Sequence, residues 1–178
     1  PAMLDDVQTA VRYLRANAGK YGIDPKRIGS CGASAGGHLA MFLGVTETRD
    51  LKPTEYPGFS SKVQAVFNFF GPCDMSKPFP PILDGIYKVV LGKEKKDAAE
   101  EIRSASPINY VDKTSAPMFI YQGLKDPLVN PDQARQAEAK YKELGLICEI
   151  RLLEGVAHEI KMTDENAGKA VNAGIAFL

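Results

Sequence analysis

The chain has 178 residues, of which 44% are hydrophobic and 25% charged, so it is long enough for one domain with a sizeable core. Its 22 basic and 22 acidic residues cancel and form no basic stripe, which gives no support to electrostatic binding of nucleic acid or of an anionic membrane and favours a small neutral partner. No apolar run approaches the length of a membrane span, and the first residues lack the basic-then-apolar order of a signal peptide.

The first third of the chain is predicted to form a helix, a turn, a strand and a second helix. Apolar residues occur at helical spacing near the start, at Met3, Leu4, Val7, Ala10, Val11 and Leu14. Turn residues follow at Tyr21–Pro25, before a short strand predicted over 27–31 and a helix over 35–43. A polar loop that contains proline is expected from near Thr48 to Ser61.

Three further apolar segments predict the remaining strands, over 63–70, 118–122 and 147–153. A helix is expected to begin at Asn130, with a capping side chain and proline at its first position, and to end at Gly145. The Ala-rich segment Asp164 to Leu178 has a helical pattern as well. Because strands alternate with helices, the sequence predicts a single α/β domain over 1–178, with about four mainly parallel strands between layers of flanking helices.

The segment from about residue 73 to residue 108 has no clean period. It contains Pro78, Pro80 and Pro81 and then a charged run over 93–103. We expect a partly helical, cap-like excursion over the top of the sheet. Two interpretations of the charged run remain open, a cover for an active site or simply a solvated face.

The chain has three cysteines, Cys31, Cys73 and Cys148, and no C-x-x-C pair. An odd number of widely spaced cysteines argues against both a zinc site and a disulfide framework. We expect reduced and mostly buried thiols, with Cys31 a small core residue in the first strand.

The segment Gly32–Gly36 matches the pattern G-x-S-x-G, with Ser34 at the corner between the first predicted strand and the following helix. Small residues on both sides let the backbone turn sharply and leave a hydroxyl exposed at the carboxyl end of a sheet. The Walker and dinucleotide patterns that phosphate binding would need are absent. The alternative is that the glycines only allow close packing of a helix on a strand, around a solvent-facing Ser34.

A serine nucleophile needs an imidazole base, and the base needs a carboxylate that orients it. Of the two histidines, His38 lies in the helix that follows Ser34 and is expected to be structural, whereas His158 follows the fourth strand and is the better base. Asp126 follows the third strand by a few residues, while Asp132 falls in the first turn of a helix and is expected to interact with its dipole. The chain order Ser34, Asp126, His158 is typical of an α/β-hydrolase triad.

Several short segments of the chain together match the sequence of a known family. They are Asp6, Val11–Arg15, Ile23–Gly29, Ser34–Ala40, Phe70–Asp74, Gly123–Asp126 and Gly155–His158. With these segments the chain resembles α/β-hydrolase esterases related to the acetyl esterase, acetylxylan esterase and hormone-sensitive-lipase-like groups. The resemblance covers nearly the whole chain. At Cys73 the family more often has threonine.

The resemblance implies a serine carboxylic-ester hydrolase that works through an acyl-enzyme. Ser34 would attack the ester, His158 would move the proton, Asp126 would hold His158, and the backbone N–H of Ala35 would meet the oxyanion. Short acyl groups are implied, on an acetylated sugar or a small aryl ester, with no metal or organic cofactor. Two alternatives remain open, a serine peptidase of the prolyl-oligopeptidase type and a noncatalytic or incomplete hydrolase fragment that binds a ligand or partner.

One departure from the family concerns the amino-terminal side. These esterases have further strands and an HGGG-like oxyanion loop there, and nothing before Pro1 supplies them. We therefore expect this chain to be the carboxyl-terminal part of a larger enzyme. The strand over 27–31 would then have an unpaired edge, covered by a missing segment or by another copy in a homo-oligomer, or prone to aggregation.

Overall fold

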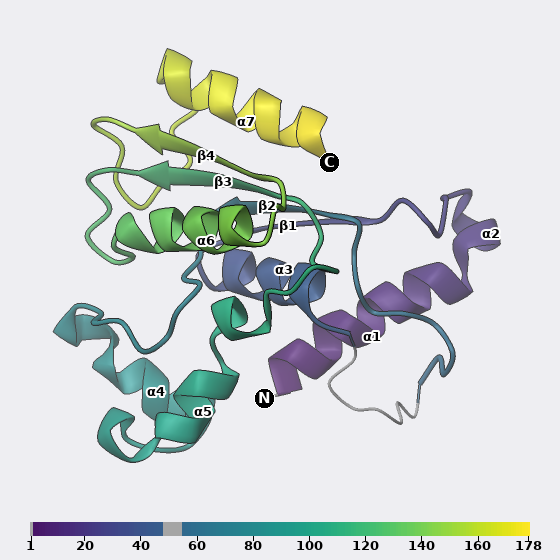
Figure 1. The fold of residues 1–178 in the computed structure, drawn as a ribbon, viewed down its shortest axis with the longest axis horizontal. Helices are drawn as coiled ribbons and strands as arrows, with labels where there is room; N and C mark the ends of the chain where they lie inside the picture. The colour runs from purple at the N-terminus through teal and green to yellow at the C-terminus, as the bar shows by residue number, and fades with distance from the viewer. Residues whose placement is uncertain (1, 48–54) are drawn as a thin grey trace.

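A computed structural model describes residues 2–47 and 55–178, so part of the polar loop expected from near Thr48 to Ser61 lies outside the described residues. The described chain forms three layers, with α7 (Glu165–Phe177) on one face of a sheet and α3 (Ala35–Val45) and α6 (Asp132–Glu143) on the other (Figure 1). In that part of the chain, no helix is both long and apolar enough to cross a membrane.

The sheet consists of four parallel strands in sequence order: β1 (Gly29–Ala33), β2 (Ala65–Phe69), β3 (Met118–Gly123) and β4 (Cys148–Leu153). This confirms the predicted α/β class and the parallel sheet. The first strand was predicted over 27–31 and lies two residues later. Parallel strands of this kind place all their carboxyl ends at one edge of the sheet, where sites of α/β folds gather.

The other helices are α1 (Ala2–Ala16), α2 (Ala18–Tyr21), α4 (Asp84–Leu91) and α5 (Ala99–Ser104), with 3-10 turns at Pro81–Leu83, Lys95–Asp97 and Pro107–Tyr110. The start of α6 differs in detail from the prediction. Asn130 Oδ1 accepts a hydrogen bond from Asp132 N at 2.9 Å, but the residue directly before the helix is Pro131. At α7 the side chain of Asp164 caps the helix by accepting from Ala167 N at 2.9 Å.

Both faces of the central strands are buried, as expected for a parallel sheet covered by helices. On the face toward α1, α3 and α6 the core is mainly aliphatic, with Met41, Val66 and Ile120 among its fully buried members. On the face toward α7 it is mainly aromatic, with Phe67 and Phe119 in edge contact. The two clusters pack the sheet against the helices on its two faces.

β1 is less covered than the other strands. Among the described residues it pairs with β2 alone, and Gly29, Cys31 and Ala33 are exposed on one face. The expectation that Cys31 is a core residue is therefore wrong, because its side chain lies on the exposed face of this edge strand. Cys73 is buried and Cys148 half-buried, and all three thiols are free. Burial raises the pKa of Cys73 and of Cys148 to about 12, so both stay protonated at neutral pH.

The excursion over 73–108 contains α4, α5 and short 3-10 turns, so its predicted, partly helical character is correct. It has a small cluster of its own around Tyr87, Ala98 and Ile102. The Tyr87 hydroxyl donates to the carbonyl of Met75 at 2.9 Å and ties α4 to the start of the excursion. The description of 1–178 as one domain with a cap-like segment stays a prediction.

The packing of α7 on the sheet yields a first prediction. A Cβ at Gly174 would lie 2.2 Å from Cζ of buried Phe67, whereas one at Gly168 in the same helix would meet only Met162 O at 3.9 Å. Urea denaturation should show Gly174→Ala destabilised by about 1–3 kcal/mol through overpacking. Gly168→Ala should be stabilised by up to about 1 kcal/mol, because alanine is the better helix former. Equal changes in the two variants would contradict this account of the contact.

Candidate active site

Ser34 occupies a strained turn between β1 and α3. Its backbone has φ 55° and ψ −120°, outside the regions that a residue with a side chain normally adopts, at a cost of about 1–3 kcal/mol. Its N–H donates to the carbonyl of Phe69 at 2.9 Å, which extends the β1–β2 ladder by one step. The turn points the serine side chain away from the helix axis at the carboxyl edge of the sheet.

Glycines at two positions allow α3 to lie close to the strands. A Cβ at Gly32 would lie 2.3 Å from the carbonyl oxygen of Gly36, and one at Gly37 would lie 2.3 Å from Asn68 Oδ1. No side chain fits at either place. Close packing is thus a real role of these glycines, and the same packing holds Ser34 in its turn.

Ser34, His158 and Asp126 lie in one line of hydrogen bonds. Ser34 Oγ is 2.9 Å from His158 Nε2, and His158 Nδ1 is 2.7 Å from Asp126 Oδ2. The three residues come from the loops that follow β1, β4 and β3, which meet at one edge of the sheet. The Asp126 side chain is fully buried and that of His158 is 14% exposed, so of these two side chains only His158 has access to solvent.

The carboxylate of Asp126 accepts three hydrogen bonds besides the one from His158. Backbone N–H groups of Leu128 and Val129 donate to Oδ1 at 2.8 and 2.9 Å, and Gln122 Nε2 donates to Oδ2 at 3.0 Å. Gln122 was not identified from the sequence. Its signal there is a lone amide near the end of an otherwise apolar strand, and in the structure it is 1% exposed. A carboxylate with this many donors is held in one orientation.

The loop that carries His158 lies directly against the loop of the acid. Lys125 N donates to the carbonyl of Val156 at 2.9 Å. A Cβ at Gly123 would lie 2.4 Å from the carbonyl oxygens of both Val156 and Ala157. The glycine at the end of β3 therefore permits the close approach that brings His158 to Asp126.

Two predicted structural residues lie outside this line. His38 Nδ1 donates to the carbonyl of Pro72 at 2.8 Å, and its ring packs edge-on against Phe42. Burial lowers the pKa of His38, against the effect of the Pro72 carbonyl, so the ring stays neutral. Asp132 begins α6 and pairs with Arg135 at 2.8 Å. Both positions fit the roles expected from the sequence.

A largely apolar cavity of about 370 Å³ opens beside Ser34. Its walls come from α1, from the Ser34 turn and α3, from the excursion over 73–108, and from the acid loop. The lining residues include Ser34, Ala35, His38, Leu39, Phe42, Met75, Phe79, Leu83, Ile86, Val90, Leu128 and Val129. An ester bound at Ser34 would place one of its two groups against these side chains.

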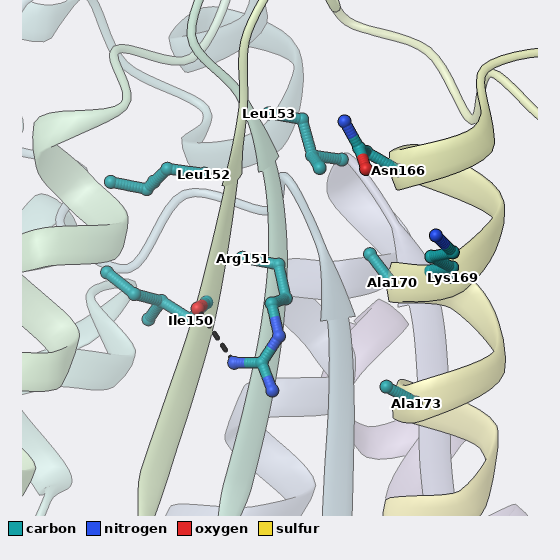
Figure 2. A pocket seen from close by; sticks show the side chains of 8 residues that line it. All are labelled: Ile150, Arg151, Leu152, Leu153, Asn166, Lys169, Ala170 and Ala173. Carbon is teal, nitrogen blue, oxygen red and sulfur yellow. Dashed lines mark hydrogen bonds between the residues drawn. The ribbon is translucent and has the colours of Figure 1, made fainter.

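A second hollow, of about 540 Å³, lies between β4 and α7 (Figure 2). Arg151 of β4 faces it together with Asn166 and Lys169 of α7, and no member of the Ser34–His158–Asp126 line contributes to it. Arg151 and Lys169 are already paired with Glu149 and Glu165.

Within the described ranges, no group of three or more His, Cys, Asp or Glu side chains could hold a metal ion.

Comparison with known proteins gives relatives of one kind. The BD-FAE family model matches residues 1–141. The chain is 33% identical to the esterase LipC of Mycobacterium tuberculosis over all of its length, but it spans only 46% of LipC. Among solved structures, a truncated carbohydrate esterase from gut microbiota is 30% identical with a TM-score of 0.83, and the alignment covers 99% of this chain and 67% of that one.

A further solved structure is the butyrate-bound esterase Est2 of Thermogutta terrifontis, 26% identical with a TM-score of 0.80, aligned over 98% of this chain and 64% of that one. The resemblance found in the sequence is thus confirmed, and the chain spans only part of the length of these relatives. From the family match together with the esterase relatives, the chain belongs to the BD-FAE family of α/β-hydrolase-fold proteins.

Proposed function

We propose that the chain carries the acid–base machinery of a serine carboxylic-ester hydrolase that acts through an acyl-enzyme on short-chain esters. The observation that supports this most directly is the line of hydrogen bonds from Ser34 Oγ through His158 to Asp126. A carboxylate only accepts, so His158 Nδ1 carries a proton and Nε2 presents a lone pair to the serine hydroxyl. This is the tautomer that a general base needs.

In the first half of the proposed reaction, Ser34 Oγ attacks the ester carbonyl carbon while His158 Nε2 takes the hydroxyl proton. The tetrahedral intermediate then breaks its bond to the alcohol oxygen. His158 Nε2 returns the proton to that oxygen, the alcohol leaves, and the acyl group stays on Ser34. Asp126 stabilises the imidazolium that exists between these two proton transfers.

In the second half, water takes the place of the alcohol. His158 Nε2 accepts a proton from the water as its oxygen attacks the acyl carbon, and then returns a proton to Ser34 Oγ as the bond to the serine breaks. The products are a carboxylic acid and the free enzyme. The proton transfers in this sequence use the side chains of Ser34 and His158 and one water molecule.

The negative oxygen of the intermediate is assigned to the backbone N–H of Ala35. This group belongs to the first turn of α3, where N–H groups have no carbonyl partner one turn earlier. The positive end of the helix dipole adds to the effect. One such donor is worth about 100- to 1,000-fold in turnover, so a second donor from elsewhere in the whole protein would raise the rate by a similar factor.

Because the cavity beside Ser34 is lined mainly by apolar side chains, we propose that it binds an acyl or aryl group of the substrate. Its volume, about 370 Å³, accommodates a short acyl chain. The butyrate found in the related Est2 esterase is of that size class. An acetylated sugar or a small aryl ester remains the proposed substrate for the same site.

The first test compares Ser34→Ala with the parent chain on p-nitrophenyl acetate and p-nitrophenyl butyrate. Loss of the nucleophile should lower kcat at least about 1,000-fold, down to the uncatalysed background. Ser60→Ala, at an exposed serine that binds Glu47, is the matched control and should keep its kcat. Circular dichroism checks the fold of each.

Covalent labelling by a fluorophosphonate extends this test, because it needs an activated serine. Labelling of the parent but not of Ser34→Ala supports the proposal. Equal background hydrolysis from all the folded proteins, with no labelling, would overturn it for this chain. A preference for proline-containing peptides over esters would favour the peptidase alternative.

A second prediction concerns Gln122. In Gln122→Leu the carboxylate oxygen that holds His158 loses one charged-group hydrogen bond, so kcat should fall about 10- to 100-fold with KM little changed. Gln136→Leu is the matched control, because Gln136 makes the same kind of bond, at 3.0 Å, to Asp74 rather than to Asp126. Similar kinetics in the two leucine variants would exclude a role for Gln122 in positioning the acid.

A further inference from the structure

Phe70, directly after β2, has an unusual backbone conformation. Its φ is 42°, in the left-handed region where residues other than glycine are strained by about 1–3 kcal/mol. Its N–H donates to the carbonyl of Tyr121 at 2.8 Å, and the residue is 4% exposed. The next residue, Gly71, has no room for a Cβ, which would lie 2.5 Å from His38 N. The backbone therefore turns sharply directly after β2, where Phe70 follows the last residue of the strand.

The ring reaches the histidine of the candidate site. The centroids of the Phe70 and His158 rings are 4.4 Å apart, with the planes tilted by 54°. The other aromatic contacts of Phe70 are looser, at 6.2 Å to Tyr121 and 6.4 Å to Phe69. The backbone strain at Phe70 is thus accompanied by a close contact with the His158 ring. Strain of this kind persists only where the surrounding structure fixes the conformation.

The contact restrains a motion that hydrogen bonds leave free. Nδ1 and Nε2 of His158 are bonded to Asp126 and Ser34, which fixes the two nitrogens but allows the ring to tilt about the line between them. A phenyl ring packed against the imidazole limits that tilt.

We infer that Phe70 is a positioning residue that holds the His158 ring in line between Ser34 and Asp126. The inference rests on the proposed function, because it assigns His158 the role of the base. The residue acts through His158 and not on the substrate. Its loss should therefore lower kcat more than it changes KM.

The test is Phe70→Leu, with Phe69→Leu as the matched control. Leucine keeps an apolar side chain and a Cβ, so the positive φ is retained at the same cost. Phe69 is 6% exposed and belongs to the same aromatic cluster, and its ring packs on Phe67 and Tyr121. Phe70→Leu should lower kcat at least about 10-fold with KM within a factor of about 2, whereas Phe69→Leu should keep kcat within about 3-fold. If Phe70→Leu does not fold, Phe70→Met, a flexible apolar replacement, serves in its place.

A second readout does not depend on activity. The chain has only two histidines, so proton NMR gives two sets of imidazole signals, which His158→Asn assigns. The ring current of Phe70 shifts the His158 signals, and this shift should be lost in Phe70→Leu and kept in Phe69→Leu. The His38 signals, set by Phe42, should stay in place in both variants.

These results separate the inference from the proposed function. Unchanged His158 signals in Phe70→Leu, or a kcat equal to that of Phe69→Leu, would overturn the inference. In that case, ester hydrolysis by the parent chain would still support the proposed function. A parent chain with neither hydrolysis nor fluorophosphonate labelling would overturn the proposed function, and with it a positioning role in catalysis, even if the NMR signals show the ring contact.

Discussion

The close approach of α3 to the ends of β1 and β2 is the constraint on which the rest of the site depends. It is possible only because Gly32, Gly37 and Gly71 lack side chains at points where a Cβ would lie between 2.3 and 2.6 Å from atoms of the neighbouring segments. A methyl group at any of them would push the helix outward. Ser34 would then lose the turn that directs Oγ toward His158, although no atom of the glycines takes part in the chemistry.

The parallel sheet supplies the second condition. Its four strands are parallel, so the loops after β1, β3 and β4 lie along one edge, although Ser34, Asp126 and His158 are far apart in the chain. Of the bonded pair, the side chain of Asp126 is fully buried and that of His158 is slightly exposed. Burial of a carboxylate is tolerated here because four N–H groups donate to it, which is how proteins keep a buried charge.

These two conditions explain how much could be predicted from the sequence. Ser34, Asp126 and His158 follow strands whose apolar runs are easy to identify, and a parallel sheet brings strand ends together whatever the details of packing. The position of Cys31 was predicted wrongly, because the short strand Gly29–Ala33 does not show by its residue types which of its two faces the helices cover. Gln122 and Phe70 were missed because neither a glutamine near a strand end nor the last phenylalanine of an aromatic run carries a local signal for the residue that it will contact.

The two strained residues of the site are hydrogen-bonded directly to the strands of the sheet. Ser34 and Phe70, both with positive φ, are the residues that follow β1 and β2, and each donates its N–H to the strand beside it, Ser34 to Phe69 at 2.9 Å and Phe70 to Tyr121 at 2.8 Å. Leu124, after β3, continues the series by donating to Leu153 at 2.9 Å. Each strained turn is thus bonded to the next strand, and the net gain of such a bond, about 1 kcal/mol, offsets part of the strain. Ser34 and the Phe70 ring beside His158 are therefore fixed to successive strands of one sheet, so the alignment of Ser34 with His158 depends on the register of those strands.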